Sequence, residues 1–279
     1  MLSIVELTKE YRIHGRSGNG NKIKAVDNVS LHFESGKCYA LVGESGSGKS
    51  TLAKILIGLE TPTQGKILYR GADIAHLSGK ERLRMRRNIK IVFQNSKSAL
   101  NPRWSVCDSI AEPLVNRHEL DKAGRMRRIK KYLELVHLPQ TTLYKHPHEL
   151  SGGEQTRVCI ARALITEPEF LIMDESVSGL DATIKKQILD LMLSIRSEIQ
   201  CSYLFITHDI EAAFYIADNI AVMKAGQIIE SVADIRSLGE LREDYSKLLV
   251  YSLPDIKNIL LGTQSDDKTA VYAEPPLPL

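Results

Sequence analysis

One short stretch of this chain limits what it can fold into more strongly than any other feature. Residues 43–51 read Gly-Glu-Ser-Gly-Ser-Gly-Lys-Ser-Thr and match the pattern GxxxxGK followed by Ser or Thr. The stretch directly follows an apolar run, Cys38–Val42, and precedes the helical pattern of residues 51–59. A strand, a glycine loop and a helix in this order turn backbone N–H groups and the positive end of a helix dipole toward one point. The sequence therefore predicts a phosphate-binding loop in an α/β chain.

This loop predicts a set of contacts to a bound nucleotide. Lys49 is expected to reach the β- and γ-phosphates, and the Ser50 hydroxyl is expected to take one position around Mg²⁺. Glycines allow successive N–H groups to turn inward around the phosphate oxygens. The predicted nucleotide contacts in the loop are Gly43, Ser45, Gly46, Gly48, Lys49, Ser50 and Thr51.

A second apolar run ends in two acidic residues. Residues 170–173 read Phe-Leu-Ile-Met and are followed by Asp174 and Glu175. An aspartate at the carboxyl end of a buried strand beside a phosphate loop can hold Mg²⁺, directly or through water. Glu175 is then placed to orient or deprotonate an attacking water. Because a phosphate loop lies in the same chain, the acidic pair is a strong indication of a catalytic site.

Short aliphatic or β-branched runs alternate with helical patterns, which favours an α/β fold with a mainly parallel sheet. The expected strands cover residues 29–34, 38–42, 66–69, 90–93, 170–173, 203–207 and 219–223. From about residue 96 to about residue 164 the strand-like runs give way to helical patterns, which predicts an inserted helical subdomain. The spacing of one of its helices places Met126, Ile129, Leu133 and Val136 on a single face, with basic residues around them.

The ends of the chain predict less regular structure. We expect one large domain over residues 1–235, with antiparallel strands near its N-terminus, and a short, partly disordered extension over residues 236–279. The tail after about Asp255 has few periodic apolar positions and ends in Pro-Pro-Leu-Pro-Leu. Residues 15–20, Gly-Arg-Ser-Gly-Asn-Gly, have turn composition and predict a flexible insertion between two early strands.

Charge and apolar content exclude several classes of protein. The net charge is +3, from 37 Lys and Arg against 34 Asp and Glu, which argues against a nucleic-acid partner. No apolar run reaches the roughly 18 residues of a membrane span, and the N-terminus lacks signal-peptide features, so a cytosolic location is expected. Four scattered cysteines predict isolated reduced thiols rather than a metal site; these are Cys38, Cys107, Cys159 and Cys201.

Residues 150–164, Leu-Ser-Gly-Gly-Glu-Gln-Thr-Arg-Val-Cys-Ile-Ala-Arg-Ala-Leu, resemble the signature sequence of ABC (ATP-binding cassette) ATPases. The resemblance covers roughly residues 2–232 and implies that family's P-loop NTPase core, with ATP and Mg²⁺ as cofactors. In the family, two ATPase domains pair head to tail, and each signature closes on the ATP held by the opposite domain. The residues implied to act in trans are Ser151, Gly152, Gly153, Glu154 and Asp181.

Matching family positions imply the remaining roles. Tyr11 resembles the aromatic residue that stacks on adenine, Gln94 the glutamine that meets Mg²⁺ and water, and His208 the histidine that contacts the γ-phosphate. The implied catalytic residues are thus Glu175, His208 and Gln94, and the implied Mg²⁺ ligands are Ser50, Gln94 and Asp174. One position departs from the pattern, because the signature commonly has glutamine where Glu154 stands. Its carboxylate either disfavours negative charge on the opposite ATP or points away from it.

Residues 93–103 and 109–114, which contain Asn-Pro-Arg and Glu-Pro-Leu, are similar to the peptide and nickel importer branch of the family. The likeness is greatest to the nickel-type second ATPase subunit, with dipeptide and oligopeptide ATPases close behind. It implies an ATPase for uptake of nickel or a nickel chelate, peripheral to the cytoplasmic face of the inner membrane. The implied partners are a second ATPase subunit (paralogue or copy), two membrane permease subunits and, indirectly, a periplasmic or extracellular substrate-binding protein. ABC ATPases of DNA repair are less favoured, because the sequence shows neither long coiled coils nor zinc-type cysteine pairs. Those of Fe–S assembly are less favoured because residues 101–114 fit them poorly.

Overall fold

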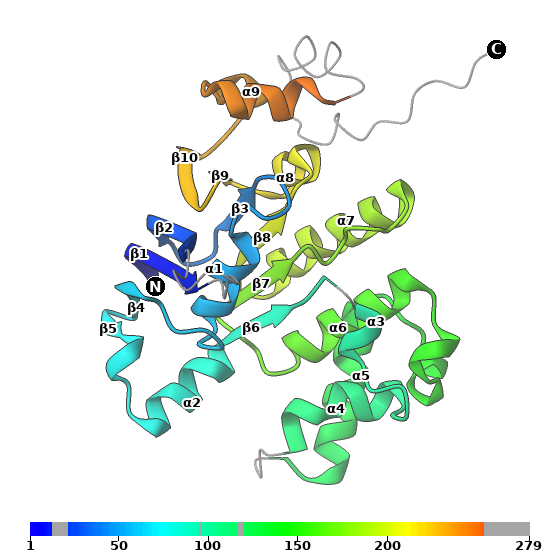
Figure 1. Ribbon diagram of the computed structural model, residues 1–279. Helices are drawn as coiled ribbons and strands as arrows, with labels where there is room; N and C mark the ends of the chain where they lie inside the picture. Colours follow the sequence, from blue (N-terminus) through cyan, green and yellow to red (C-terminus); the bar gives the residue numbers. More distant parts are fainter. Residues whose placement is uncertain (13–21, 95, 116–119, 254–279) are drawn as a thin grey trace, which may run out of the picture.

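The protein is described by a computed structural model in which two β-sheets are covered by helices (Figure 1). The structure describes residues 1–12, 22–94, 96–115 and 120–253. The predicted flexible insertion at 15–20 and the tail from 255 onward lie outside the described residues. Along the described parts of the chain, no helix has the length and apolar surface that crossing a lipid bilayer requires.

A four-stranded antiparallel sheet is built by the N-terminal part of the chain, as predicted. Its spatial order is β2-β1-β4-β5. The strands are β1 (Leu2–Arg12), β2 (Lys22–Phe33), β4 (Gln64–Tyr69) and β5 (Ala72–Asp73). A strand before residue 15 was expected without bounds, because the polar outward residues of β1 dilute the apolar signal of its buried Leu2, Ile4 and Leu7.

The larger sheet has six strands in the order β10-β9-β3-β8-β7-β6. They are β3 (Cys38–Val42), β6 (Ile89–Val92), β7 (Phe170–Asp174), β8 (Ser202–Thr207), β9 (Asn219–Lys224) and β10 (Gln227–Val232). All neighbouring pairs are parallel except β10 with β9, which is antiparallel. Because carboxyl ends of parallel strands meet at one edge, the loops after β3, β7 and β8 lie together.

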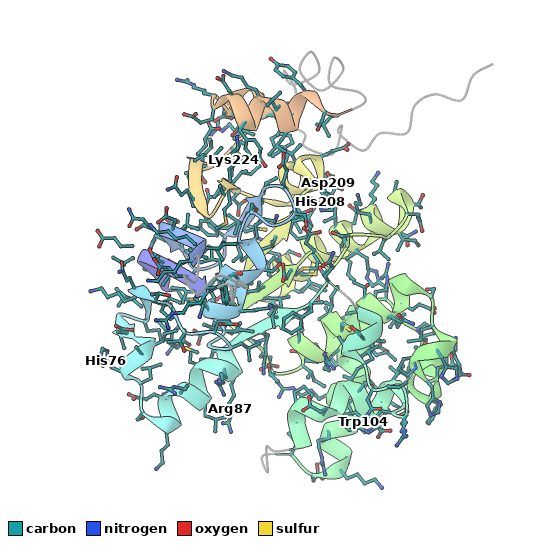
Figure 2. All side chains as sticks on the ribbon, in the orientation of Figure 1. His76, Arg87, Trp104, His208, Asp209 and Lys224 are labelled. Atoms are coloured by element: carbon teal, nitrogen blue, oxygen red, sulfur yellow. The ribbon has the colours of Figure 1, made fainter. Side chains whose placement is uncertain are left out.

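Helices pack around this sheet and extend beyond it. The core helices are α1 (Lys49–Leu56), α2 (Gly79–Asn88), α7 (Ala182–Glu198) and α8 (Ile210–Ile216). Between β6 and β7, the described residues form helices and turns and no strand, as expected of a helical insertion. Its helices are α3 (Ser96–Ala99), α4 (Val106–Val115), α5 (Lys122–Leu135) and α6 (Gly152–Leu164). Trp104 lies on the surface of this unit (Figure 2).

One residue of the apolar face of α5 is exposed. Ile129, Leu133 and Val136 are buried, whereas the side chain of Met126 is 37% exposed. Met126 occupies the second turn of a helix whose N-terminal part carries Arg125, Arg127 and Arg128. Met126 is exposed because the buried stripe of α5 begins at Ile129, where the helix meets the α4 and α6 packing core.

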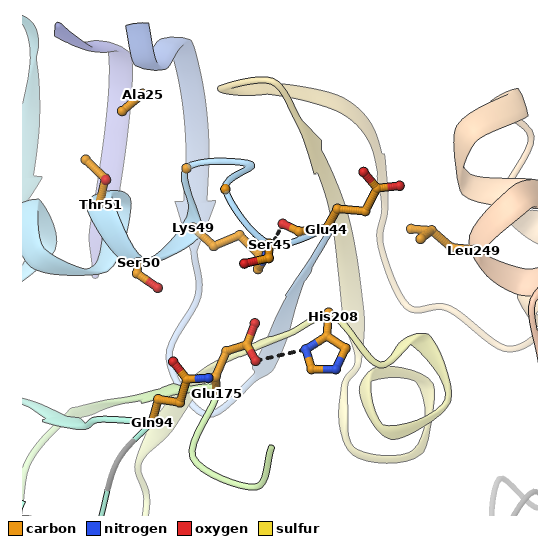
Figure 3. A pocket seen from close by; sticks show the side chains of 12 residues that line it. Ala25, Glu44, Ser45, Lys49, Ser50, Thr51, Gln94, Glu175, His208 and Leu249 are labelled. Atoms are coloured by element: carbon orange, nitrogen blue, oxygen red, sulfur yellow. Dashed lines mark hydrogen bonds and ion pairs between the residues drawn. The ribbon is translucent and has the colours of Figure 1, made fainter. Parts of the chain in front are cut away.

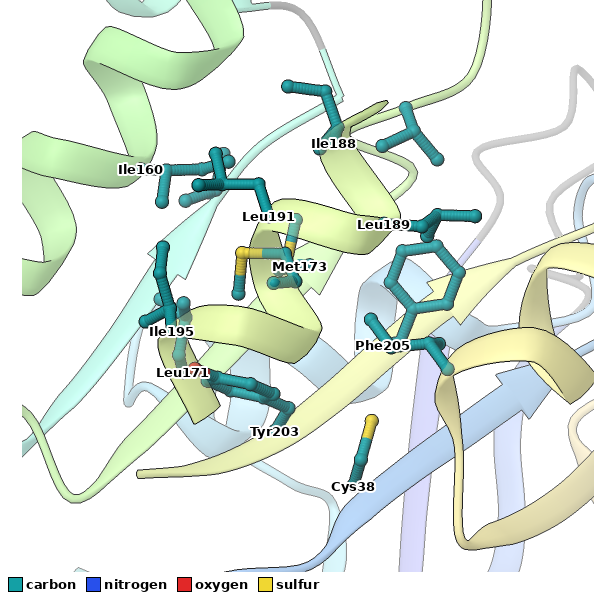
Figure 4. Packing of buried hydrophobic residues seen from close by; sticks show 14 of the residues in the cluster. Cys38, Ile160, Leu171, Met173, Ile188, Leu189, Leu191, Ile195, Tyr203 and Phe205 are labelled. Carbon is teal, nitrogen blue, oxygen red and sulfur yellow. The ribbon is translucent and has the colours of Figure 1, made fainter. Parts of the chain in front are cut away.

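The parallel strands separate two apolar cores. In β7, Phe170 and Ile172 face one core while Leu171 and Met173 face the other. β8 alternates in the same way, since side chains on a strand point to opposite faces. The core on the α7 side is shown in Figure 4, where Ile188, Leu189 and Ile195 of α7 pack over β7 and β8. Both faces being covered explains why the sequence of these strands is apolar nearly throughout.

The chain continues past β10 into an ordered segment. A turn of 3₁₀ helix (Leu238–Glu240) is followed by α9 (Asp244–Tyr251). Leu238, Leu241 and Val250 are buried and join the α7-side core. The first part of the predicted C-terminal extension is therefore packed against the domain.

Candidate active site

A cavity of about 530 Å³ opens at the carboxyl ends of β3, β7 and β8. Figure 3 shows side chains from the loop after β3, from α1, from the end of β7 and from the loop after β8 converging on it. Its lining consists of Ala25, Glu44, Ser45, Gly46, Gly48, Lys49, Ser50, Thr51, Gln94, Glu175, His208 and Leu249. The topology thus brings together the phosphate loop, Gln94, Glu175 and His208, which lie far apart in sequence.

Two glycines of the phosphate loop are required by close packing. Gly48 has φ 108°, and a Cβ atom there would lie 2.0 Å from the carbonyl oxygen of Ala25. A Cβ atom at Gly43 would lie 2.1 Å from the carbonyl oxygen of Met223. Any larger residue would push the loop away from β2 and β9. The same backbone makes Gly48 the N-cap of α1 without a side-chain capping bond, so the first N–H groups of α1 remain for a ligand.

Lys49 is held inside the loop. Its side chain is 4% exposed, and Nζ donates to the carbonyl oxygens of Gly43 and Glu44, both at 2.7 Å, and to Ser47 Oγ at 3.2 Å. Burial lowers the pKa of Lys49, although the carboxylates of Glu175 and Asp174 act in the opposite direction. A buried ammonium bound mainly by neutral carbonyls is well placed to gain energy from phosphate oxygens.

Asp174 and Ser50 form a pair of oxygen donors beside the loop. Ser50 Oγ donates to Asp174 Oδ1 at 3.0 Å. Burial raises the pKa of Asp174, while the Ser50 hydrogen bond works against that rise. A carboxylate and a hydroxyl next to a phosphate position are the ligand types that Mg²⁺ takes, so these residues fit that ion.

Glu175 combines a strained backbone with a fixed side chain. Its φ of 49° lies in the left-handed region, which is costly for a residue with a Cβ and is often retained at functional sites. The side chain is largely buried, and Oε2 accepts a hydrogen bond from Ser178 Oγ at 2.6 Å. His208 Nδ1 lies 2.8 Å from the same oxygen, as the dashed line in Figure 3 shows. These contacts hold the carboxylate against the cavity.

Several contributors to the cavity were not predicted. Ala25 comes from β2, and Leu249 comes from α9. The hydrogen bond of Ser178 to Glu175 depends on the turn after β7, which spacing alone does not reveal. Leu249 lies in a segment where the sequence pattern was weak.

Tyr11 is not among the lining residues. It lies near the end of β1, its side chain is 37% exposed, and Lys9 Nζ lies 5.0 Å from its ring centroid. The chain that follows it, residues 13–21, lies outside the described residues. Stacking of Tyr11 on adenine stays a prediction.

The signature residues lie away from the cavity, at the start of α6. Ser151 caps that helix, since its Oγ accepts from Glu154 N at 3.3 Å, and Glu154 Oε2 accepts from Ser151 N at 2.8 Å. The Glu154 carboxylate therefore turns back onto its own helix. Asp181 caps α7 through Ile184 N at 2.9 Å. The contacts of Ser151, Gly152, Gly153, Glu154 and Asp181 to a nucleotide on another subunit stay predictions.

Glu154→Gln should leave the free energy of unfolding at pH 7 within about 0.5 kcal/mol, because glutamine can make the same capping box. The N–H of Ser151 holds the pKa of Glu154 below its ordinary value of 4.5. The folded chain thus binds this proton more weakly than the unfolded chain. The stability that this ionisation contributes is present above pH 4.5 and is lost as pH falls below it. Glu154→Gln has no carboxylate at this position and does not lose stability in this way.

Urea unfolding of both chains at pH 7 and pH 4 measures this effect. Ser151→Ala, which removes the cap itself, should cost about 1 kcal/mol and serves as the comparison. A loss for Glu154→Gln as large as that for Ser151→Ala would show that the carboxylate does more than cap α6.

Comparison with known proteins decides the family. The model of the ABC transporter family matches residues 26–178, more than half of the chain. The chain belongs to the ABC transporter family. It is 38% identical over 260 residues to "Oligopeptide transport ATP-binding protein OppF" of Lactococcus lactis subsp. lactis (strain IL1403), covering 92% of this chain and 81% of OppF. It is 41% identical over 231 residues to "Nickel import ATP-binding protein NikE" of Escherichia coli O6:K15:H31 (strain 536 / UPEC), covering 83% of this chain and 86% of NikE.

The fold of this ABC ATPase agrees with a solved cassette. The dimeric structure of the ATP-binding cassette MJ0796 in a post-hydrolysis state, bound to ADP and Pi, superposes with a TM-score of 0.74. The identity is 29%, and the alignment covers 84% of this chain and 99% of that cassette. The family resemblance drawn from the signature and the predicted fold class are confirmed. As an ABC ATPase domain, the chain binds ATP and belongs to a family that couples ATP hydrolysis to transport.

Proposed function

We propose that this chain is the ATP-hydrolysing subunit of an ABC importer for nickel or a nickel chelate. The convergence of Lys49, Glu175 and His208 on one cavity, with Asp174 bonded to Ser50 beside it, carries the catalytic part of the proposal. The NikE relatives, at 41% identity, support nickel as cargo. An oligopeptide is the second candidate, because the OppF alignment extends over 92% of the chain against 83% for NikE.

The residues of the cavity divide the chemistry among them. Lys49 and the N–H groups at the start of α1 bind the β- and γ-phosphates. Ser50, Asp174 and Gln94 would hold Mg²⁺, which would neutralise charge on the phosphate oxygens. Glu175 orients a water and accepts its proton, and His208 contacts the γ-phosphate while restraining the Glu175 carboxylate. Ser178 fixes the same carboxylate from the other side.

A second subunit completes the site in this proposal. The exposed start of α6, with Ser151 and Gly152 at its tip, is an N–H-bearing helix end like that of α1. One chain does not require two such ends for one nucleotide, so the signature is assigned to ATP on the opposite subunit. The partner is a paralogue or a copy, arranged head to tail. ATP then drives closure because it binds the closed pair more tightly than the open one.

A groove between β6 and the helical insertion suits a permease helix. It encloses about 400 Å³ and is lined by Lys90, Ile91, Ala99, Asn101, Trp104, Glu112, Pro113, Arg162 and Ala163. Asn101, Glu112 and Pro113, from the sequence typical of peptide and nickel importers, line this groove. Arg162 Nη1 donates to Ala99 O at 2.8 Å and ties α6 to α3. Since Gln94 lines the ATP cavity shortly before α3, a change at the nucleotide is passed to the groove through a short piece of chain.

Two permease subunits would dock at such grooves on the two ATPases. The chain would then sit peripherally at the cytoplasmic face of the inner membrane. A periplasmic or extracellular binding protein would deliver cargo to the permease without touching this chain. No nucleic-acid partner is included in the proposal.

Nickel accumulation by cells lacking this gene tests the cargo. Complementation with the intact chain should restore accumulation, whereas Glu175→Gln should not, because it removes the proton acceptor. Growth on a peptide as sole source of a required amino acid is measured in the same strains. If nickel uptake is unchanged by the deletion and peptide use is lost, the nickel assignment is wrong and the peptide assignment replaces it.

A further inference from the structure

The C-terminal helix α9 contacts the phosphate loop directly. Tyr245 Oη accepts a hydrogen bond from the backbone N–H of Glu44 at 3.1 Å. One helical turn further along, Leu249 lines the ATP cavity, and Figure 3 shows it across from Glu44. Two side chains of one short helix thus reach the same nucleotide site.

Contacts to β9, β10 and the α7-side core fix the position of α9. Tyr245 is 8% exposed, and Lys224 Nζ of β9 lies 4.4 Å from its ring centroid, a cation–π contact. The carboxylate of Glu230, in β10, accepts hydrogen bonds from the backbone N–H groups of Arg242 at 2.6 Å and Glu243 at 3.3 Å. These bonds fix the chain where it enters α9. Val250 is buried in the α7-side core.

A short chain of hydrogen bonds links α9 to the phosphate-binding lysine. Tyr245 receives the N–H of Glu44, and the carbonyl oxygen of Glu44 receives Lys49 Nζ at 2.7 Å. Ser47 N also donates to that carbonyl oxygen at 3.2 Å. Burial raises the pKa of the Tyr245 phenol, so the hydroxyl stays protonated at neutral pH. The Gly43 carbonyl, which shares a peptide group with the Glu44 N–H, also accepts from Lys49 Nζ, at 2.7 Å. Tyr245 therefore helps to hold a peptide group that positions Lys49.

From these contacts we infer that α9 is a working part of the nucleotide site, with Tyr245 as a positioning residue for the phosphate loop and Leu249 as an apolar wall of the cavity. The inference rests on the proposed function, since it assumes that the cavity holds the triphosphate. It assigns to residues 236–253 a role in nucleotide affinity that the core motifs do not include. Removing the Tyr245 hydroxyl leaves the Glu44 N–H without this acceptor, so the unliganded loop is less ordered and more of the cost of ordering it falls on nucleotide binding.

The test is titration of the purified full-length chain with MgADP, which probes the phosphate loop without turnover. Tyr245→Phe keeps the ring, and thus its packing and the Lys224 contact, but removes the acceptor. We expect its affinity for MgADP to fall about fivefold to tenfold, the effect of losing one partly buried hydrogen bond that preorganises the loop. The matched control is Tyr251→Phe on the same helix, where the side chain is 62% exposed; its affinity should be unchanged.

A second pair of variants tests the role of α9 without changing Tyr245. Leu249→Ala should weaken MgADP binding about threefold by opening the cavity wall, whereas Leu248→Ala, at a side chain that is 65% exposed, should not. Calorimetric stoichiometry separates the possibilities, because misfolding lowers the number of sites while mispositioning lowers affinity at full stoichiometry. In ATPase assays the KM for ATP should rise with kcat retained.

The outcomes distinguish this inference from the proposed function. If Lys49→Ala abolishes binding while Tyr245→Phe and Leu249→Ala both bind within twofold of the parent chain at full stoichiometry, α9 has no part in the site and the inference is wrong. If Lys49→Ala binds normally, the assignment of the cavity itself fails. Reduced affinity in both α9 variants, with both controls unchanged, supports the role of α9.

Discussion

Glu175→Gln should lower ATP turnover by about 10² to 10⁴-fold, the usual contribution of a positioned general base. Glutamine has nearly the same shape and still accepts the Ser178 hydrogen bond made at Oε2. It cannot take a proton from water near neutral pH. Binding of MgATP should therefore persist, because the phosphate loop and Lys49 are untouched. Phosphate release at saturating MgATP measures the loss, and calorimetry on the same preparation confirms binding.

The chain offers a close control for this substitution. Glu167 also has a left-handed backbone, with φ 53°, and its carboxylate is bonded to Tyr132 and Arg128 far from the ATP cavity. Glu167→Gln should leave turnover unchanged, which excludes a general effect of removing a carboxylate from a strained backbone position. Turnover by Glu175→Gln above a tenth of the parent value, with Glu167→Gln normal, would move the role of base to another residue.

The parts of the site that sequence predicted are those fixed by strand order. Lys49, Glu175 and His208 each follow an apolar strand, and parallel pairing of β3, β8 and β7 must bring such residues to one edge. Their meeting at one cavity needed no knowledge of side-chain packing. The glycines at 43 and 48 were predictable for a related reason, because a loop that approaches both phosphates and neighbouring strands leaves no room for a Cβ.

What sequence missed depends on tertiary packing. Tyr245 and Leu249 belong to a helix of eight residues, too short for periodicity to identify and too far along the chain to be tied to the phosphate loop by spacing. Met126 carried the right periodicity and is nonetheless exposed, because packing and not pattern decides where an apolar stripe begins. In both cases the missing information is which surface a helix meets.

Lys49→Ala should weaken nucleotide binding at least about 100-fold. The charge-assisted hydrogen bonds of an ammonium to phosphate oxygens are worth about 1.5–3 kcal/mol each, and two of them account for a loss of this size. Calorimetric titration with MgADP measures it. The control is Lys54→Ala on the same helix, where the side chain is exposed and the change in helix propensity is the same.

The free energy of unfolding of Lys49→Ala distinguishes a loss of phosphate contacts from a loss of folded structure. Because burial lowers the pKa of Lys49, the folded state disfavours the charged form relative to the unfolded state. The ammonium therefore carries a desolvation cost in the fold, and its removal should not lower the free energy of unfolding by more than about 1 kcal/mol. Lys49 is thus buried at a cost to the free energy of folding, and its main contribution is to nucleotide binding. Lys49→Ala that unfolds readily would instead mean that the three hydrogen bonds of Nζ hold the loop together, and its loss of binding would then reflect the fold rather than the phosphates.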